Sequence, residues 1–285
     1  MEVKPLLLQV LGCDFSSAPS RRKPIVVAQG LLDTQRSCVR LQGFANFASL
    51  DDWSGFLAQR GTWVGGFDLP FGLPRELVES LGWPTDWQTC IAYYAGLTRG
   101  EIREQFKAFC DARPVGGKFA HRVTDGPAGS SPSMKWVNPP VAYMLHAGVP
   151  RLLAAGIDMP GLLYQGSGKV ALEAYPGLLA RELLGRESYK SDDIKRQTPE
   201  RLAARQYCVD ALLAGMHSLA IRLDAPYAQQ QTMVHDATGD QLDAVICMLQ
   251  AAWGLLQYQR GSALYGLPEG LDSLEGWIVS APLSR

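Results

Sequence analysis

The amino-acid sequence predicts an α/β protein in which a mixed five-stranded sheet is flanked by helices. Short apolar runs that end in turn-forming residues are typical of buried strands, and stretches with apolar residues at helical spacing follow them. At 285 residues and 47% apolar composition, the chain can bury a sizeable core. We expect a single domain over residues 1–285, with a helical and loop insertion at about 75–165 between the fourth and fifth strands.

The first three strands are predicted near the start of the chain. Residues 6–13 form a nearly continuous apolar run followed by the turn-prone sequence FSSAPS, as expected for a strand buried on both faces. Residues 24–32 and 37–44 are rich in β-forming residues, and the polar sequence DTQR between them predicts a hairpin.

A helix and two more strands complete the predicted sheet. In LDDWSGFLAQR, the residues Trp53, Phe56 and Leu57 share one helical face, and the two aspartates favour the helix start. The sequence GTWVGGFDLP predicts the fourth strand. The fifth strand is predicted in GKVALEAYPG, where Pro176 ends it.

The predicted insertion contains RPVGGKFAHRVTDGPAGSSPSMKWVNPP, a long sequence with little periodicity. A loop of this length in a compact protein is usually functional or mobile, so we expect a lid or a substrate surface. Its alternating basic and aromatic side chains suit contacts to phosphates and unpaired bases. The alternative is a solvated loop with a small core of its own. The candidates for substrate binding are Lys118, Arg122, Lys135 and Trp136.

The last strong element is a helix that begins near residue 240. A capping box is expected between Thr238 and Gln241, and the apolar stripe that follows is expected to pack on the sheet. At about 100° per residue, Asp243 falls on the flank of that stripe and Asp240 lies about 60° beyond it. The stripe consists of Leu242, Val245, Ile246, Leu249, Trp253 and Leu256.

Composition limits the classes of partner. With 27 basic and 28 acidic residues the net charge is −1, so a nucleic-acid partner needs a local basic surface. The six cysteines lack CxxC spacing and are expected to be reduced core residues. The N-terminal apolar segment is too short to span a bilayer and lacks a convincing cleavage site, so we expect a cytoplasmic protein without a membrane partner.

Four acidic residues stand where buried elements end or begin. Asp14 closes LLLQVLGCD, Asp68 closes TWVGGFD, and the pair Asp240 and Asp243 opens DQLDAVICMLQAAW. Carboxylates are depleted in strands, so each one marks either a turn or a place where charge is needed. Taken singly, each suits an Asx-turn, a proline-set turn or a helix start. Two strands that both end this way favour a shared site.

The order of these elements resembles the RNase H-like fold. The D-x-x-D-A opening of the last helix is similar to that of RuvC-type Holliday junction resolvases. More closely, GCDFSSAP, FDLPFGLP, LEAYPG, the DQLDA helix and the final EGWIV resemble an uncharacterised family of predicted RNase H-like nucleases. The resemblance covers nearly the whole chain, and its specificity lies in the order and spacing of the motifs.

This resemblance implies a metal-dependent nuclease in which a cluster of carboxylates binds Mg²⁺ or Mn²⁺. It implies that Asp14 is the first-strand acid that bridges two metal ions and that Asp68 is the fourth-strand acid. By the same resemblance Asp240 and Asp243 are the helix pair, and Glu173 matches an E-x-x-P motif as a further catalytic candidate. Hard cations prefer oxygen ligands, and two ions about 3.5–4 Å apart serve in-line phosphodiester hydrolysis. The implied partner is DNA or RNA.

Two other classes share this underlying sheet. Actin-like and sugar-kinase-type ATP-dependent phosphotransferases also carry an aspartate after the first strand, but they normally need two such domains and glycine-rich nucleotide loops, and this chain lacks a second D-x-G-x-T-like turn. A non-catalytic nucleic-acid- or protein-binding module would keep the fold without turnover. Metal titration separates the three classes, because a two-metal site binds Mn²⁺ or Mg²⁺ through Asp14 and Asp68 whereas an ATPase binds nucleotide first.

Overall fold

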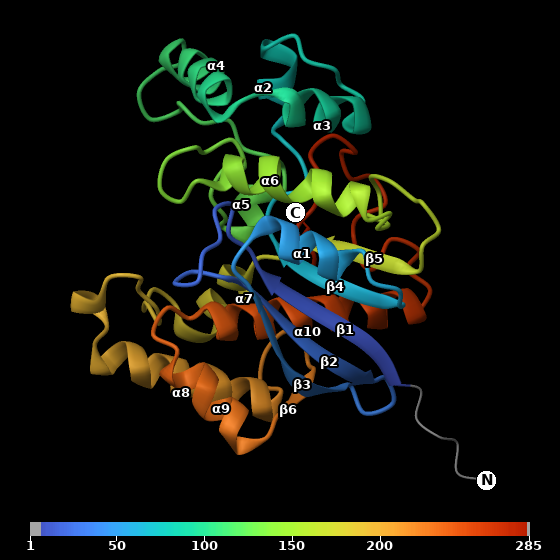
Figure 1. Cartoon of the computed structure of the whole chain (residues 1–285), viewed down its shortest axis with the longest axis vertical. Helices are drawn as coiled ribbons and strands as arrows, with labels where there is room; N and C mark the ends of the chain where they lie inside the picture. The colour runs from blue at the N-terminus through green and yellow to red at the C-terminus, as the bar shows by residue number, and fades with distance from the viewer. Residues whose placement is uncertain (1–6, 284–285) are drawn as a thin grey trace.

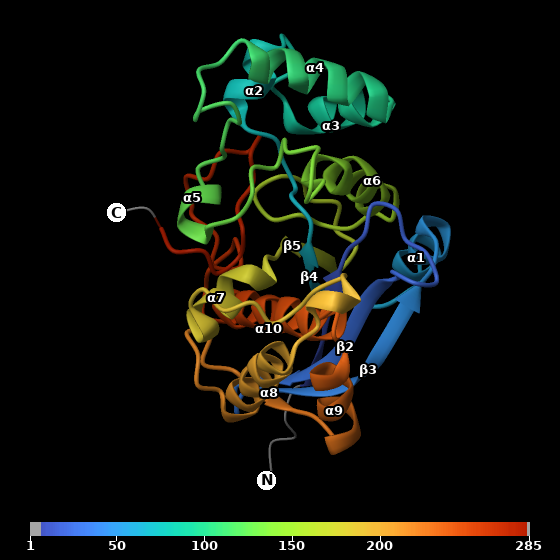
Figure 2. The same cartoon turned by 90° about the vertical axis from the view of Figure 1, so that its left-hand side faces the viewer.

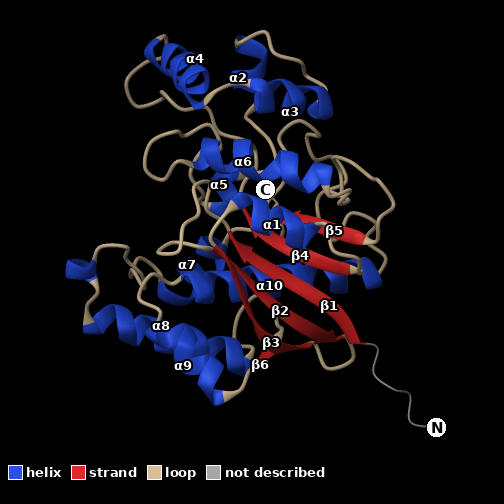
Figure 3. Cartoon of the chain, in the orientation of Figure 1, coloured by secondary structure: helices blue, strands red, loops and turns tan. Residues whose placement is uncertain are grey.

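The computed structural model describes residues 7–283, and a mixed six-stranded sheet lies at its centre (Figures 1 and 3). The strand order is β5-β4-β1-β2-β3-β6. Neighbours are antiparallel across β1–β2–β3, whereas β4 runs parallel to β1, β5 to β4 and β6 to β3. The strands are β1 (Leu7–Asp14), β2 (Ile25–Asp33), β3 (Cys38–Phe47), β4 (Trp63–Asp68), β5 (Lys169–Glu173) and β6 (Arg222–Asp224).

Five of these strands and the β2–β3 hairpin confirm the sequence prediction, but the count of five is wrong by one. The additional strand, β6, pairs with the edge of β3 between Cys38 and Arg40. It has three residues, of which only Leu223 is buried. A segment this short shows no recognisable alternation of apolar and polar residues, so the sequence gives no signal for it.

Helices cover both faces of the sheet. The face that includes Val10 and Val64 packs against α7 to α10, and the opposite face packs against α1 and α6. The helices α2 to α6 lie between β4 and β5 in the chain, and α2 to α4 sit at the far end of the molecule from α8 and α9 (Figures 1 and 2). The helices are α1 (Leu50–Leu57), α2 (Arg75–Ser80), α3 (Trp87–Gly96), α4 (Arg99–Asp111), α5 (Asp125–Ala128), α6 (Val141–Ala154), α7 (Pro176–Leu184), the 3-10 helix η1 (Ile194–Arg196), α8 (Pro199–Ala214), α9 (Tyr227–His235) and α10 (Asp240–Gln259).

The helix α10 rests directly on the backbone of β1 and β4 at two glycines. Gly12 and Gly66 are register partners on these adjacent strands. A Cβ atom on Gly12 would lie 2.0 Å from the carbonyl oxygen of Ala244, and one on Gly66 would lie 2.2 Å from that of Cys247. Since neither position tolerates a side chain, the two glycines fix how deeply α10 sits on the sheet.

Strand alternation determines which side chains face α10. Val10 and Val64 belong to the core beneath α10, whereas Leu11 and Phe67 belong to the core beneath α1 and α6. Side chains two residues apart on a strand share a face. The residues that end β1 and β4, two positions beyond the glycines, therefore face α10.

The start of α10 differs from the expected capping box. The N-cap is Gly239 with φ 79°, and no side chain caps the helix from that position. The Asp236 side chain caps the helix instead. Its Oδ2 accepts a hydrogen bond from the Gln241 backbone N–H at 2.9 Å, and its Oδ1 accepts one from the Thr238 hydroxyl at 2.6 Å. A carboxylate accepts both bonds and carries the charge that a helix start favours, so it displaces the threonine–glutamine pair.

The predicted apolar stripe and the cysteines agree with the structure. Leu242, Val245, Ile246 and Leu249 are fully buried, and the six cysteines are free and buried. Across residues 7–283, no helix is long and apolar enough to cross a membrane.

Gly12→Ala and Gly66→Ala are each expected to lower the free energy of unfolding by about 2–3 kcal/mol or more, because the added Cβ meets helix backbone that cannot move aside. Urea denaturation measures the loss. Gly55→Ala in α1 is the matched control: its Cβ meets nothing within 4 Å, so the change is expected to be neutral or stabilising by up to about 1 kcal/mol. Equal effects in all three variants would contradict the proposed backbone contact.

A candidate carboxylate centre at the ends of β1 and β4

Asp14 and Asp68 end two adjacent parallel strands and are register partners. Neighbouring strands lie about 4.8 Å apart, so the two carboxylates leave the sheet side by side. Both are half-buried and face α10, two residues beyond the Gly12–Gly66 pair. The sequence predicts that these two acids share a site, and their register places them together.

The first turn of α10 adds two more carboxylates. Asp243 is fully buried and Asp240 is 8% exposed. Asp243 precedes Ala244, whose carbonyl oxygen lies against Gly12, so the contact between helix and sheet carries this carboxylate toward the strand ends. Asp240 lies in the same turn, where burial raises its pKa and the nearby ammonium of Lys23 offsets part of that rise.

Burial and neighbouring carboxylates raise the pKa values of Asp14, Asp68 and Asp240. Burial and then the charge of Asp243 raise the pKa of Asp14 well above its usual value. Burial raises the pKa of Asp68 to about 7, with Asp243 contributing, and burial with Asp236 raises the pKa of Asp240 to about 6. Burial and mutual repulsion thus disfavour the charged form of these acids, and a bound cation would stabilise that form.

One ammonium group reaches into this centre. Lys190 forms an ion pair with Asp243, and the Tyr189 hydroxyl donates a 2.5 Å hydrogen bond to the other Asp243 oxygen. The charge of Lys190 lowers the pKa of both Asp14 and Asp68, although burial still dominates. Hydrogen bonds to its backbone hold the segment around Lys190 in place. The Arg205 side chain donates to the Tyr189 carbonyl at 2.6 Å, and the Ser191 N–H donates to the Ala237 carbonyl at 3.1 Å.

Sequence reasoning does not identify Tyr189 or Lys190. They lie in the polar sequence ESYKSDD between α7 and η1, which has no periodicity and matches no catalytic motif. The only signal is the local density of charged residues.

The donor chemistry of the centre suits Mg²⁺ or Mn²⁺. All four candidate ligands are carboxylates, and hard divalent cations prefer oxygen. Within residues 7–283, no three His, Cys, Asp or Glu side chains are already arranged to hold a metal ion. The two oxygens of Asp243 are taken by Tyr189 and Lys190, so Lys190 has to leave Asp243 before a cation can bind that carboxylate.

No family model, curated protein or solved structure matches this chain. The geometry of the centre therefore carries the functional argument.

Glu173 lies outside the carboxylate centre. It is the register partner of Phe67, so its side chain leaves the sheet on the face opposite Asp14 and Asp68. There Arg122 binds it through two hydrogen bonds of 2.6 and 2.8 Å, and the Phe71 N–H donates a third at 2.9 Å. Its charge still reaches Asp68 and helps to raise the pKa of that acid, but its own oxygens are bound by Arg122 and Phe71.

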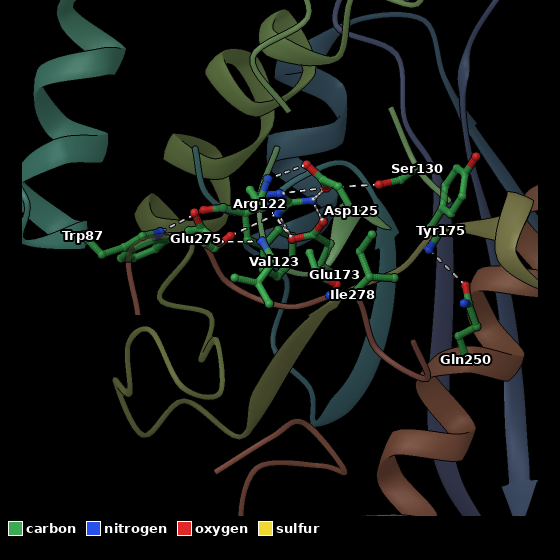
Figure 4. A network of polar contacts seen from close by, with 12 residues as sticks. Trp87, Arg122, Val123, Asp125, Ser130, Glu173, Tyr175, Gln250, Glu275 and Ile278 are labelled. Carbon is green, nitrogen blue, oxygen red and sulfur yellow. Dashed lines mark hydrogen bonds and ion pairs between the residues drawn. The ribbon is translucent and has the colours of Figure 1, made fainter. Parts of the chain in front are cut away.

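The Arg122 side chain is the centre of a buried network (Figure 4). Its five N–H donors are all used, by Glu173, by Asp125 and by the Glu275 carbonyl. The Glu275 carboxylate accepts from the Val123 and Arg75 N–H groups, each at 2.8 Å. These contacts tie the loop before α5 and the C-terminal segment to the end of β5, and they leave Arg122 no free donor for a phosphate.

The other substrate-binding candidates lie apart from the acids. Lys118 is exposed beside the end of α4, where it helps Lys107 lower the pKa of Asp111. Lys135 and Trp136 are half-buried, and the Trp136 ring packs against Phe119 with ring centroids 5.5 Å apart. Phe119 and Trp136 both pack against the core that lies beneath α1 and α6.

Lys190→Met is expected to lower the free energy of unfolding by roughly 1–3 kcal/mol without divalent cation, because Asp243 is left buried without its partly exposed counter-charge. Thermal unfolding with and without Mn²⁺ is the measurement. Mn²⁺ is expected to stabilise this variant more than the unmodified protein, since no ammonium competes for Asp243. Lys195→Met changes an exposed lysine in η1 and is expected to have neither effect. An equal response to Mn²⁺ in all three proteins would exclude the competition.

Proposed function

We propose that this protein is a metal-dependent nuclease that hydrolyses phosphodiester bonds of nucleic acid, with Asp14, Asp68, Asp240 and Asp243 as ligands of Mg²⁺ or Mn²⁺. The observation that carries the proposal is the register pairing of Asp14 with Asp68 beneath the first turn of α10. Their pKa values are raised by burial and by neighbouring carboxylates, so their charged forms lack a compensating partner that a divalent cation would supply.

The topology supports an RNase H-like assignment. Three strands, a helix, a fourth strand that ends in an acid, a fifth strand and a late helix that opens with D-x-x-D follow one another in the chain order on which the resemblance rests. In this proposal β6 is an extra edge strand. The acids at the ends of β1 and β4 and in the first turn of α10 support the same assignment.

A bound divalent cation supplies charge stabilisation at the attacked phosphate and lowers the pKa of a water molecule. The chain's own residues supply the rest. Asp14 and Asp68 would bind the cation at the strand ends. Lys190, once released from Asp243, would be free to bind a phosphate oxygen. Glu173 has a structural role here, because its ion pair with Arg122 holds the loop before α5 against the end of β5.

Exposed basic residues near the centre provide the local surface that a net charge of −1 requires. Arg21 and Arg22 lie on the loop after β1, and Arg186 lies on the loop after α7. An ion pair of 2.5 Å between Lys23 and Asp192 joins these two loops. They form a basic rim beside the carboxylates that suits a phosphate backbone.

Cleavage tests this proposal directly. DNA, RNA, hybrid and branched substrates are incubated with Mn²⁺ and either the unmodified protein, Asp14→Asn or Asp68→Asn. Each substitution is expected to lower the cleavage rate about a hundredfold or more, because it removes a carboxylate that balances the cation.

Asp51→Asn is the control for these variants, because Asp51 is exposed at the start of α1 and distant in sequence from the centre. It is expected to cleave like the unmodified protein. Equal cleavage by Asp14→Asn and the unmodified protein would exclude the proposed centre. Cation binding without cleavage of any substrate would favour the non-catalytic module.

Cation binding is expected to tighten as the pH rises through about 7, because Asp68 has to lose its proton first. The raised pKa also means that folded Asp68 holds a proton more strongly than the unfolded chain does, with its usual value of 3.8. Without cation, stability should therefore fall as the pH rises from about 4 to about 7 and then level off. Calorimetric titration with Mn²⁺ and thermal unfolding across this range measure both trends. In Asp68→Asn the dependence near pH 7 should weaken, and an unchanged profile would contradict the assignment.

A further inference from the structure

A partly enclosed cavity of about 300 Å³ opens beside the carboxylate centre. Asp68 and Lys190 form its edge on the side of the centre, and the Arg122–Glu173 network forms part of its base. The volume is at the lower end of the roughly 300–1,000 Å³ that is usual for small-molecule sites.

A wider groove of about 680 Å³ meets this cavity at the same point. Asp68, Tyr175 and Lys190 line both spaces. The groove also carries the exposed residues Arg181, Arg186 and Glu187, so with Lys190 its three basic residues outnumber its two acidic ones. A strand whose backbone follows the basic groove would therefore pass the carboxylates at the mouth of the cavity.

The walls of the cavity suit a neutral, planar group and not an anion. Pro139, Val141, Met144 and Ile278 provide apolar surface, and Ser130 and Ser131 provide hydroxyl groups. The five donors of Arg122 are already used, while Asp68 and Glu173 would repel a phosphate. An aromatic ring with hydrogen-bonding edges matches this combination, and the Tyr175 ring at the mouth offers a stacking surface.

We propose that the cavity receives one unpaired nucleobase of a nucleic-acid strand whose scissile phosphate lies at Asp14, Asp68 and Lys190. This inference rests on the proposed nuclease function and narrows its substrate class to strands with an unpaired nucleotide beside the cleaved bond. A paired base is held in its duplex and cannot enter the cavity without being extruded.

Binding can be measured without turnover. Asp14→Asn protein with Mn²⁺ is titrated into DNA and RNA duplexes that carry a fluorescent adenine analogue, either paired or as a single unpaired nucleotide. The analogue reports when its base leaves water or stacks on a new surface. Val141→Trp and Met144→Trp, each added to this background, fill the cavity from α6. Val137→Trp is the matched control, because Val137 is 48% exposed and does not line the cavity.

The unpaired probe is expected to change its emission on binding, and both cavity-filling variants are expected to bind it about tenfold or more weakly, since base stacking contributes about 1–3 kcal/mol. The Val137→Trp control should bind like its parent. The DNA and RNA duplexes show which backbone is preferred. Thermal unfolding confirms that each variant is folded, and the two filling variants give independent readings.

The outcomes separate this inference from the nuclease proposal. If the unmodified protein cleaves nucleic acid but paired and unpaired probes bind equally and filling has no effect, the cavity assignment is overturned and the nuclease stands. If the unpaired probe binds and filling weakens it, but no protein cleaves, the cavity assignment holds and the nuclease fails. If no probe binds, the cavity assignment is overturned, and the cleavage assay alone decides the nuclease proposal.

Discussion

The contact between α10 and the paired glycines of β1 and β4 determines the rest of this structure. At Gly12 and Gly66 the helix backbone lies directly on the strand backbone, at a separation that excludes even a methyl group. The contact fixes both the depth and the rotation of the helix. Since Asp243 comes one residue before Ala244, its carboxylate is placed over the strand ends by main-chain packing and needs no attraction between the acids.

This placement has an electrostatic consequence. Four carboxylates are held together in a partly buried position, and burial together with neighbouring carboxylates disfavours the charged forms of Asp14, Asp68 and Asp240. The ion pair between Lys190 and Asp243 offsets part of that repulsion, and the Tyr189 hydroxyl binds the remaining Asp243 oxygen. The carboxylate cluster is unfavourable by itself, and the packing of α10 on the glycines and of the two hydrophobic cores compensates for it. Such locally unfavourable clusters are typical of functional sites.

The sequence predicts the parts of this arrangement that depend on local pattern. Strand ends at Asp14 and Asp68 and the apolar stripe of α10 are visible because burial repeats at fixed spacing along one element. The side of the sheet on which Glu173 lies depends on its register with Phe67, and the position of Lys190 depends on how a loop packs against the turn before α10. Neither relation has a local signal, because both join segments far apart in the chain.

A comparison of Glu173 with Asp14 and Asp68 shows why burial alone does not identify a site. Glu173 is buried, but N–H donors from Arg122 and Phe71 bind both of its oxygens, so its charge serves to join three segments of the chain. Asp14 and Asp68 face other carboxylates, with one partly exposed ammonium to balance them. The fully hydrogen-bonded Glu173 therefore holds the wall of the cavity in place. Asp14 and Asp68, on the opposite face of the same sheet, lack such partners, so a bound cation would stabilise their charged forms most.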